Sequence, residues 1–256
     1  MKHIARKRFG QHFLKDRQVL SDLVAAISPQ TTDHVIEIGP GTGALTQLLL
    51  KHLPRLTAIE IDRDLVEHLK KACPPDRLLI HQGDVLRFDF RRVITDGQYR
   101  LVGNLPYNIS TPLLFRLIPF ADRIRDQHFM LQKEVVERMI AAPGSKAYGR
   151  LSILLQWRYQ MDLLFTVPPA MFSPPPRVES AVVRMISRTA PQPCHPDKLE
   201  KTVTAAFSQR RKMLRNTLAP LFDEATLVQV GIDPLQRPEN LSVEQYIVLS
   251  EHLPLS

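Results

Sequence analysis

The chain has 256 residues, of which 44% are hydrophobic, and its 34 Lys and Arg residues against 26 Asp and Glu residues give a formal net charge of +8. This length suits one large domain with a smaller second unit, and the charge favours a polyanionic partner such as nucleic acid over the alternative of a merely basic enzyme. No apolar run fits a secretion signal or a membrane span, which predicts a cytoplasmic protein, and the two isolated cysteines argue against a disulfide framework or a metal site.

Up to residue 142 the sequence alternates amphipathic segments with short apolar runs. The predicted strands are residues 34–39, 55–62, 77–84, 99–104 and 126–132, and the predicted helices are residues 16–28, 44–53, 64–72, 112–118 and 133–142. Strands that take turns with helices indicate a parallel sheet covered on both faces. A helix at 150–159 and two late strands at 161–167 and 178–187 complete the prediction of a seven-stranded sheet with an antiparallel hairpin at one edge.

A proline-rich segment at residues 188–197 has few apolar residues and reads as a linker. Every segment beyond it has helical character. We therefore expect two domains, an α/β domain over residues 1–188 and a small all-helical domain over residues 189–256.

The stretch EIGPGTGALT, residues 37–46, follows the first predicted strand and opens a helix. Gly39, Gly41 and Gly43 permit a tight turn and let a ligand approach backbone N–H groups. The spacing also fits the dinucleotide-binding pattern, with Glu60 about 20 residues on, at the end of the second strand, where an acid can bind ribose hydroxyls. The alternatives are a tight turn without a ligand and a structural role for Glu60.

The third predicted strand ends at Gly83 and Asp84, at the same sheet edge as Glu60. There Asp84 can accept a hydrogen bond from an adenine amino group; the alternative is that it begins a turn or caps a helix. This series of strand ends resembles the Rossmann-like methyltransferases that use S-adenosyl-L-methionine. The resemblance makes Glu37 the acid that orients the glycine turn near the methionine end of the cofactor.

The fourth predicted strand runs directly into Asn104, Leu105, Pro106 and Tyr107. In an amino methyltransferase, the Asn104 amide oxygen and the Leu105 carbonyl each accept one proton of an adenine amino group and so aim its nitrogen at the methyl carbon. Pro106 favours an extended Leu105 and has no N–H, and Tyr107 can stack on a base flipped out of its helix. A simple turn with Tyr107 at its rim is the alternative.

Two segments concentrate positive charge, residues 1–17 and residues 205–218. The residues expected on RNA phosphates are Arg6, Lys7 and Arg8 in the first segment and Arg211, Lys212 and Arg215 in the second. A helical projection places the latter three outside the apolar face and Arg210 within it, which predicts a structural ion pair for Arg210. Solvated charge is the alternative for the exposed residues.

Several longer stretches narrow the resemblance to one family. The stretches RKRFGQHFL, EIGPGTGALT, GNLPYNIST, HFMLQKEVVERM, FSPPPRVES and AFSQRRKMLRNTL are similar to the small-subunit ribosomal RNA dimethyladenosine transferases. The resemblance implies dimethylation of two adjacent adenosines in a hairpin loop near the end of 16S ribosomal RNA, within the assembling small (30S) ribosomal subunit. It also implies a Rossmann-like domain and S-adenosyl-L-methionine as the cofactor. Methyl transfer from this cofactor requires no metal, and we expect a monomeric enzyme.

The resemblance assigns three more residues of the site. His12 and Leu14 belong to an N-terminal segment that lies over the cofactor in the family; other members often show Asn where His12 stands, so the Leu14 backbone is the firmer contact. Phe172, in FSPPPRVES, corresponds to an aromatic residue that closes on the second face of the base. The alternative for Phe172 is a core residue.

Three other functions each fit part of the sequence. An enzyme with the same chemistry on large-subunit RNA shares the cofactor domain, but AFSQRRKMLRNTL resembles the small-subunit group. An inactive assembly or transcription factor conflicts with the intact EIGPG, QGD and NLPY stretches. A nicotinamide oxidoreductase leaves NLPY without a use.

Overall fold

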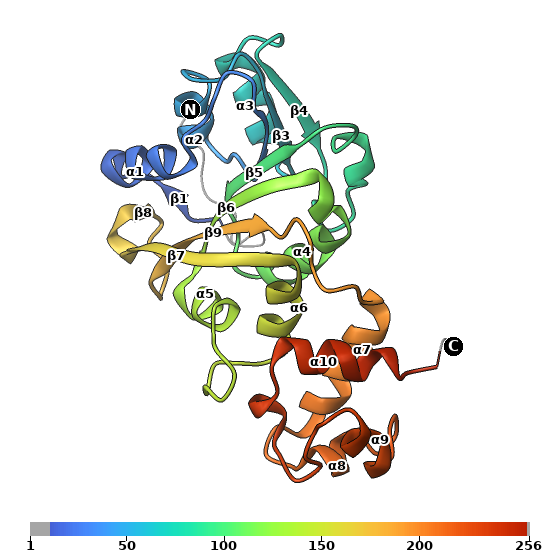
Figure 1. Ribbon diagram of the computed structural model, residues 1–256. Coiled ribbons are helices and arrows are strands. Elements are labelled where there is room, and N and C mark those ends of the chain that lie inside the picture. The colour runs from blue at the N-terminus through green and yellow to red at the C-terminus, as the bar shows by residue number, and fades with distance from the viewer. Residues whose placement is uncertain (1–10, 255–256) are drawn as a thin grey trace. The chain divides into compact units, whose positions relative to one another are not determined.

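The computed structural model describes residues 11–254 of the chain (Figure 1). These residues form two compact units, one of residues 11–136 and 161–187 and one of residues 137–160 and 188–254. Three of the predicted RNA contacts, Arg6, Lys7 and Arg8, lie outside the described residues.

The first unit is built around a seven-stranded sheet. In spatial order the strands are β4 (Leu78–Gln82), β3 (Leu56–Glu60), β2 (His34–Ile38), β5 (Tyr99–Asn104), β6 (Ile124–Gln132), β9 (Ser180–Ser187) and β7 (Tyr159–Val167). The five strands from β4 to β6 pair in parallel, and β9 pairs antiparallel with β6. The predicted mostly parallel sheet, with an antiparallel addition at one edge, is confirmed.

The strand order determines where a ligand can enter. The chain moves outward from β2 to β3 and β4, and then returns to form β5 on the other side of β2. The connections that leave β2 and β5 therefore diverge. Open α/β sheets bind ligands at such a point, beyond the carboxyl ends of the strands.

Helices cover the sheet because their apolar faces need burial. The helices of the first unit are α1 (Arg17–Ile27), α2 (Ala44–Leu49), α3 (Arg63–Ala72) and α4 (Ser110–Leu117), and α5 (Lys133–Met139) begins in it. Side chains of α1, α2 and α3 share one core cluster with strand residues such as Val35 and Val102. The alternate strand residues Ile36 and Leu101 are equally buried on the opposite face, since successive side chains of a strand point to opposite faces.

A second, two-stranded sheet joins β1 (Phe13–Leu14) to β8 (Phe172–Ser173), with Leu14 opposite Phe172. The Lys15 N–H extends this pairing by donating to the Met171 carbonyl at 3.0 Å. Strands of two residues show no periodicity, so the sequence did not predict them. Their pairing places residues 11–14 beside the carboxyl ends of the large sheet.

The second unit is helical over residues 188–254. Its helices are α6 (Arg150–Arg158), α7 (Pro196–Ala206), α8 (Leu214–Thr217), α9 (Glu224–Gln229) and α10 (Val243–Glu251). The break near residue 188 coincides with a boundary between the units, but residues 137–160, which we expected in the first domain, lie in the second unit. The reason is that α6 packs on α7 and α10 and buries most of its apolar residues.

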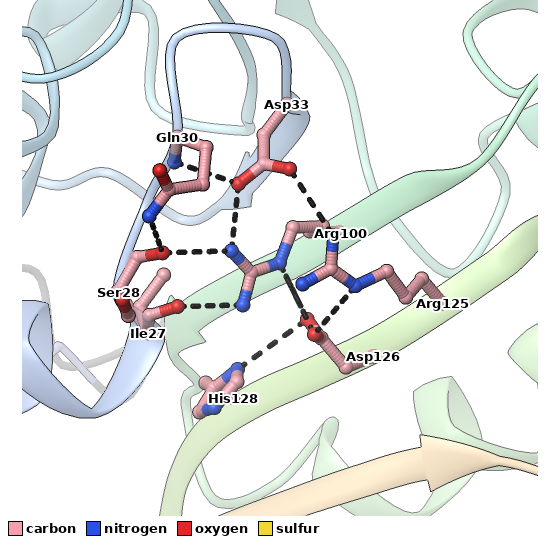
Figure 2. Close-up of polar contacts among 8 residues, drawn as sticks. All are labelled: Ile27, Ser28, Gln30, Asp33, Arg100, Arg125, Asp126 and His128. Atoms are coloured by element: carbon pink, nitrogen blue, oxygen red, sulfur yellow. Dashed lines mark hydrogen bonds and ion pairs between the residues drawn. The ribbon is translucent and has the colours of Figure 1, made fainter.

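Opposite the carboxyl ends, the first unit buries a guanidinium among carboxylates (Figure 2). Arg100 of β5 is 4% exposed and lies 2.7 Å from an oxygen of Asp33 and 2.9 Å from an oxygen of Asp126, and it also donates to the carbonyls of Ile27 and Ser28. Burial alone lowers the pKa of Arg100, but the two carboxylates outweigh that effect and raise it. This cluster ties α1 to β5 and β6.

Candidate active site

A cavity of about 420 Å³ lies within the first unit at the carboxyl ends of the strands β2, β3, β4 and β5. Its volume is in the range of roughly 300–1,000 Å³ that is usual for small-molecule sites. The lining comes mainly from residues 11–14, 37–42, 59–61, 83–86 and 104–109. The structure therefore brings together the glycine turn, the predicted acids and the NLPY stretch.

The glycine turn needs glycine for two different reasons. Gly39, Gly41 and Gly43 all have positive φ, at 66°, 58° and 86°, a region that side chains disfavour. Space is also restricted, because a Cβ on Gly43 would lie 2.6 Å from a methyl of Leu69 in α3, and one on Gly41 would lie 3.0 Å from the Phe13 ring. The turn thus permits close packing of α3 and of the N-terminal segment around the cavity.

Glu60, at the end of β3, holds the glycine turn through its own carboxylate. One oxygen accepts from the Gly41 N–H at 3.1 Å and the other from the Asp62 N–H at 2.9 Å, and the side chain is 5% exposed. Burial raises the pKa of Glu60, and these N–H donors only partly offset the rise. Glu60 lines the cavity, as a residue expected to bind ribose hydroxyls must.

Glu37, near the end of β2, is a buried acid beside the cavity. Its carboxylate accepts a hydrogen bond of 2.7 Å from the Thr46 hydroxyl of α2. Burial, with a smaller contribution from the charge of Glu60, raises the pKa of Glu37 to about 7. Glu37 is thus divided between its neutral and charged forms near neutral pH, so a cation in the cavity can shift it to the anion.

Asp84 follows β4 and lines the cavity together with Val85 and Leu86. Its carboxylate accepts from the Leu86 N–H at 2.9 Å, so it begins a turn, which was the alternative to ligand binding. A carboxylate has further acceptor positions, and the two roles are compatible.

The N-terminal segment covers the cavity from another side. His12 and Leu14 both line it, and Leu14 is 7% exposed. Gln11 also lines the cavity, and its side chain donates to Asp62, the fully buried N-cap of α3, at 3.3 Å. Neither Gln11 nor Asp62 is predicted from the sequence, because the only signal for either is an N-cap position after a strand.

Asn104 has a fixed amide orientation. Its Nδ2 donates to the backbone carbonyl of His12 at 2.8 Å, and a carbonyl can only accept, so the bond identifies the nitrogen end of the amide. The other end, Oδ1, is a hydrogen-bond acceptor, and Asn104 lines the cavity. Leu105 follows with its N–H bonded to the Met130 carbonyl at 3.1 Å.

Tyr107 is held at its hydroxyl and on its ring. The hydroxyl lies 2.8 Å from the hydroxyl of Ser180, and the His12 ring stacks on the phenol ring with centroids 5.7 Å apart and 28° between the planes. Pro106 and Tyr107 both line the cavity. Asn104, Leu105, Pro106 and Tyr107 therefore form one continuous part of its wall.

Phe172 is not brought to this site. It is 1% exposed, belongs to the core cluster with Leu14, and is not among the residues that line the cavity. In this structure it is a core residue, the alternative to the expected base contact. The physical reason is the β1–β8 pairing, which places the Leu14 backbone directly opposite Phe172.

The basic residues of the tail lie in the second unit. Arg211, Lys212 and Arg215 are exposed. Arg210 lies 3.6 Å from Glu239 and donates to the Ser145 carbonyl at 3.2 Å, which confirms the predicted ion pair. The chain is not one continuous helix here, because α7 ends at Ala206 and α8 begins at Leu214.

Residues 11–254 contain neither a candidate metal site nor a candidate membrane-spanning helix. In this part of the chain, no three or more His, Cys, Asp or Glu side chains are grouped so that they could hold a metal ion. None of the helices in the same residues has the length and apolar character needed to cross a membrane.

Similarity to known proteins extends over nearly the whole chain. A family model described as Ribosomal RNA adenine dimethylase matches residues 2–254. Ribosomal RNA small subunit methyltransferase A of Janthinobacterium sp. (strain Marseille) is 58% identical over 255 residues, covering 99% of this chain and 100% of that protein. The protein of the same name from Chromobacterium violaceum is 55% identical over 256 residues, covering 98% and 97%.

Solved structures agree with this similarity. A dimethyladenosine transferase from Plasmodium falciparum has a TM-score of 0.82 at 27% identity and covers 93% of this chain and 96% of that chain. A 23S rRNA methyltransferase, ErmE, shares the fold, with a TM-score of 0.71 at 22% identity over 94% and 99% of the chains.

Proposed function

Because the chain belongs to the ribosomal RNA adenine dimethylase family, we infer that it dimethylates adenosines of small-subunit (16S) ribosomal RNA. It is an enzyme, an rRNA adenine dimethyltransferase. The observation that supports this chemistry most directly concerns Asn104, which lines the cavity. Its amide nitrogen donates to the His12 carbonyl, which leaves the amide oxygen as the acceptor. We also propose that the methylated nucleotides are two adjacent adenosines in a hairpin loop near the end of 16S ribosomal RNA.

We propose S-adenosyl-L-methionine as the cofactor. The cavity fits it, because Glu60 and Asp84 provide acceptors at the ends of β3 and β4, and Gly39 and Gly41 of the turn line the cavity without side chains. Glu37 is placed to compensate positive charge, and Leu14 and His12 cover the cavity. When bound, this cofactor supplies an electrophilic methyl group on a positively charged sulfur.

The protein then has to align the amino nitrogen of the adenine with the methyl group of the cofactor. The Asn104 Oδ1 and the Leu105 carbonyl accept the two amino protons, which orients the nitrogen lone pair without a strong base. Tyr107 stacks on the flipped base, whose removal from its helix costs a few kcal/mol. Holding these groups on a short segment at the carboxyl end of β5 fixes their position relative to the loops that are proposed to bind the cofactor.

The substrate RNA is proposed to be bound as part of the assembling 30S subunit, by a monomeric cytoplasmic enzyme. Arg211, Lys212 and Arg215 are exposed cations in the second unit, and each phosphate contact adds to the salt dependence of binding. Changing all three to Glu should weaken subunit binding and flatten its dependence on salt. A matched control changes the exposed cations Arg55, Lys70 and Lys71 of the first unit to Glu. If both triple variants lose the same subunit affinity, the tail cations are not specific contacts to RNA phosphates.

The test of the function is a mapping experiment. Labelled cofactor is supplied with undermethylated small subunits, with large subunits and with naked RNA, and the modified nucleotides are mapped. We expect dimethyladenosine in the small subunit alone. Label confined to the large subunit would instead support the alternative substrate.

Asn104 has its own test within that assay. Asn104→Ala should retain cofactor binding and lose most turnover, whereas the exposed Asn240→Ala should behave as wild type. Near-normal turnover in Asn104→Ala would refute the assigned role.

A further inference from the structure

Tyr107 makes a contact that the proposed chemistry does not require. Its hydroxyl lies 2.8 Å from the hydroxyl of Ser180, and Ser180 is fully buried. A buried hydroxyl without a partner costs free energy, so this pairing satisfies both groups. The two residues are 73 positions apart in sequence.

The strand topology explains how they meet. Tyr107 follows β5, and Ser180 is the first residue of β9, which lies two strands away with β6 between them. Because β9 runs antiparallel to β6, its first residue lies beside Gln132, the last residue of β6, at the carboxyl edge of the sheet. Neighbouring strands are roughly 4.8 Å apart, so the Tyr107 side chain crosses the end of β6 to reach β9.

The ring of Tyr107 is thereby restrained in two places. Ser180 holds the hydroxyl end of its long axis, and the His12 ring contacts one face at 5.7 Å between centroids, which limits rotation about that axis. The His12 ring is itself held, since its Nδ1 lies 2.8 Å from the Pro174 carbonyl. The plane of the phenol is therefore determined by β9 and the N-terminal segment as well as by β5.

We propose that Ser180 is a positioning residue for adenine methylation, which holds the hydroxyl end of the Tyr107 ring and so fixes the long axis of the ring against which the target base stacks. This proposal rests on the proposed function, because it concerns the same site and substrate. A ring held at its hydroxyl cannot tilt freely, and small errors in the position of the nitrogen are costly for a transfer that depends on alignment.

The protonation state of Tyr107 is consistent with this role. Burial raises the pKa of the phenol, and the hydrogen bond with Ser180 lowers it only in part. The phenol therefore stays neutral at physiological pH, and the pair of hydroxyls always has a proton to share. The interaction does not depend on pH in the range where ribosomes assemble.

The experiment is a double-mutant cycle with Ser180→Ala, Tyr107→Phe and the double variant, assayed on undermethylated small subunits. Each single change should lower kcat about 10-fold, as expected for one hydrogen bond that aligns the reacting group. The double variant should be no slower than either single variant, because both changes remove the same bond. Cofactor affinity, measured by calorimetry, should stay within about 2-fold of wild type, and Ser180→Thr should restore most of kcat because it keeps the hydroxyl.

The same two strands supply matched controls. Ser187→Ala removes a hydroxyl from the last residue of β9, one with no hydrogen-bond partner among residues 11–254. Tyr99→Phe removes the hydroxyl of the first residue of β5, where it contacts Thr95. Both lie at the opposite edge of the sheet from the cavity, and both variants should keep wild-type kcat.

Two outcomes overturn the proposal. One is a Ser180→Ala enzyme with unchanged kcat, including a variant that only melts at a lower temperature, since that result assigns Ser180 to stability alone. The other is a double variant that is about 100-fold slower, since independent losses multiply. If the wild-type enzyme methylates no small-subunit adenosine, the proposed function itself fails, and that result is distinct from an active wild type with active Ser180 variants.

Discussion

At the amino ends of its strands the sheet buries Asp33 and Asp126 against Arg100 (Figure 2). At the carboxyl ends it buries Glu37 and Glu60 against a hydroxyl and backbone N–H groups. In the first arrangement, the positive charge of Arg100 compensates the negative charges of the two aspartates. Burial raises the pKa of Asp126, but the neighbouring His128 and Arg100 outweigh this and hold it below its ordinary value. The second arrangement leaves both glutamates with raised pKa values.

The difference shows that one sheet uses its two edges for opposite purposes. A buried ion pair with its hydrogen bonds in place contributes to a defined structure, but breaking it is costly. Buried acids without a matching cation destabilise the protein that surrounds them. They also favour a cationic ligand, such as the sulfonium cofactor that we propose.

The largest expected effect is on the free energy of unfolding, when the positive charge of Arg100 is removed from the amino edge of the sheet. Arg100→Met leaves Asp33 and Asp126 buried without their cation and should lower the free energy of unfolding by about 3–5 kcal/mol. Urea denaturation at pH 7 measures it. Arg91→Met, which breaks an exposed pair with Asp89, is the control and should change little; similar losses in both variants would contradict the distinction between the edges.

A second effect concerns stability at the carboxyl edge. The folded-state pKa of Glu37 is raised from 4.5 to about 7, so the folded protein holds this proton more tightly than the unfolded chain does. Its contribution to stability is therefore present below pH 4.5 and is lost as the pH rises through 7, a loss of about 3 kcal/mol. Asp126 has the opposite sign, because its lowered pKa makes stability fall as the pH decreases.

Glu37→Gln tests this sign. Compared with wild type without cofactor, the variant should gain stability progressively between pH 5 and pH 7, as measured by unfolding free energies at several pH values. The exposed Glu67→Gln serves as a control with no pH-dependent gain. A constant difference between Glu37→Gln and wild type would show that Glu37 does not titrate in this range.

The smallest effect is on ligand affinity. Because Glu37 changes from neutral to anionic near pH 7, affinity for S-adenosyl-L-methionine should rise about 10-fold between pH 6 and pH 8. S-adenosylhomocysteine has no sulfonium charge and should show a weaker dependence, and Glu37→Gln should flatten both curves. Calorimetric titrations would decide, and equal pH dependence for the two ligands would mean that Glu37 does not sense the charge on sulfur.

Much of the fold and cavity was predictable because it depends on local patterns. Alternating apolar runs and amphipathic helices required a parallel sheet, and parallel strands place all their carboxyl ends at one edge. Glu60, Asp84 and Asn104 each stand at such an end and line one cavity, as predicted. The family assigned from the motifs is confirmed by the match over residues 2–254.

Other features depended on pairings that no local pattern encodes. Phe172 is in the core rather than at the cavity because two-residue strands bring it opposite Leu14. Gln11 reaches Asp62, and residues 137–160 join the helical unit, through contacts between distant segments.

By itself, then, the sequence determined which chemical groups stand at the strand ends, since strand and helix periods depend only on neighbouring residues. Only the tertiary structure decided how those groups are held. The orientation of the Asn104 amide comes from a carbonyl 92 residues away, and the long axis of the Tyr107 ring is held by a strand that runs in the reverse direction. Long-range pairing sets these geometries, because chain segments far apart in sequence become neighbours only when the sheet has formed.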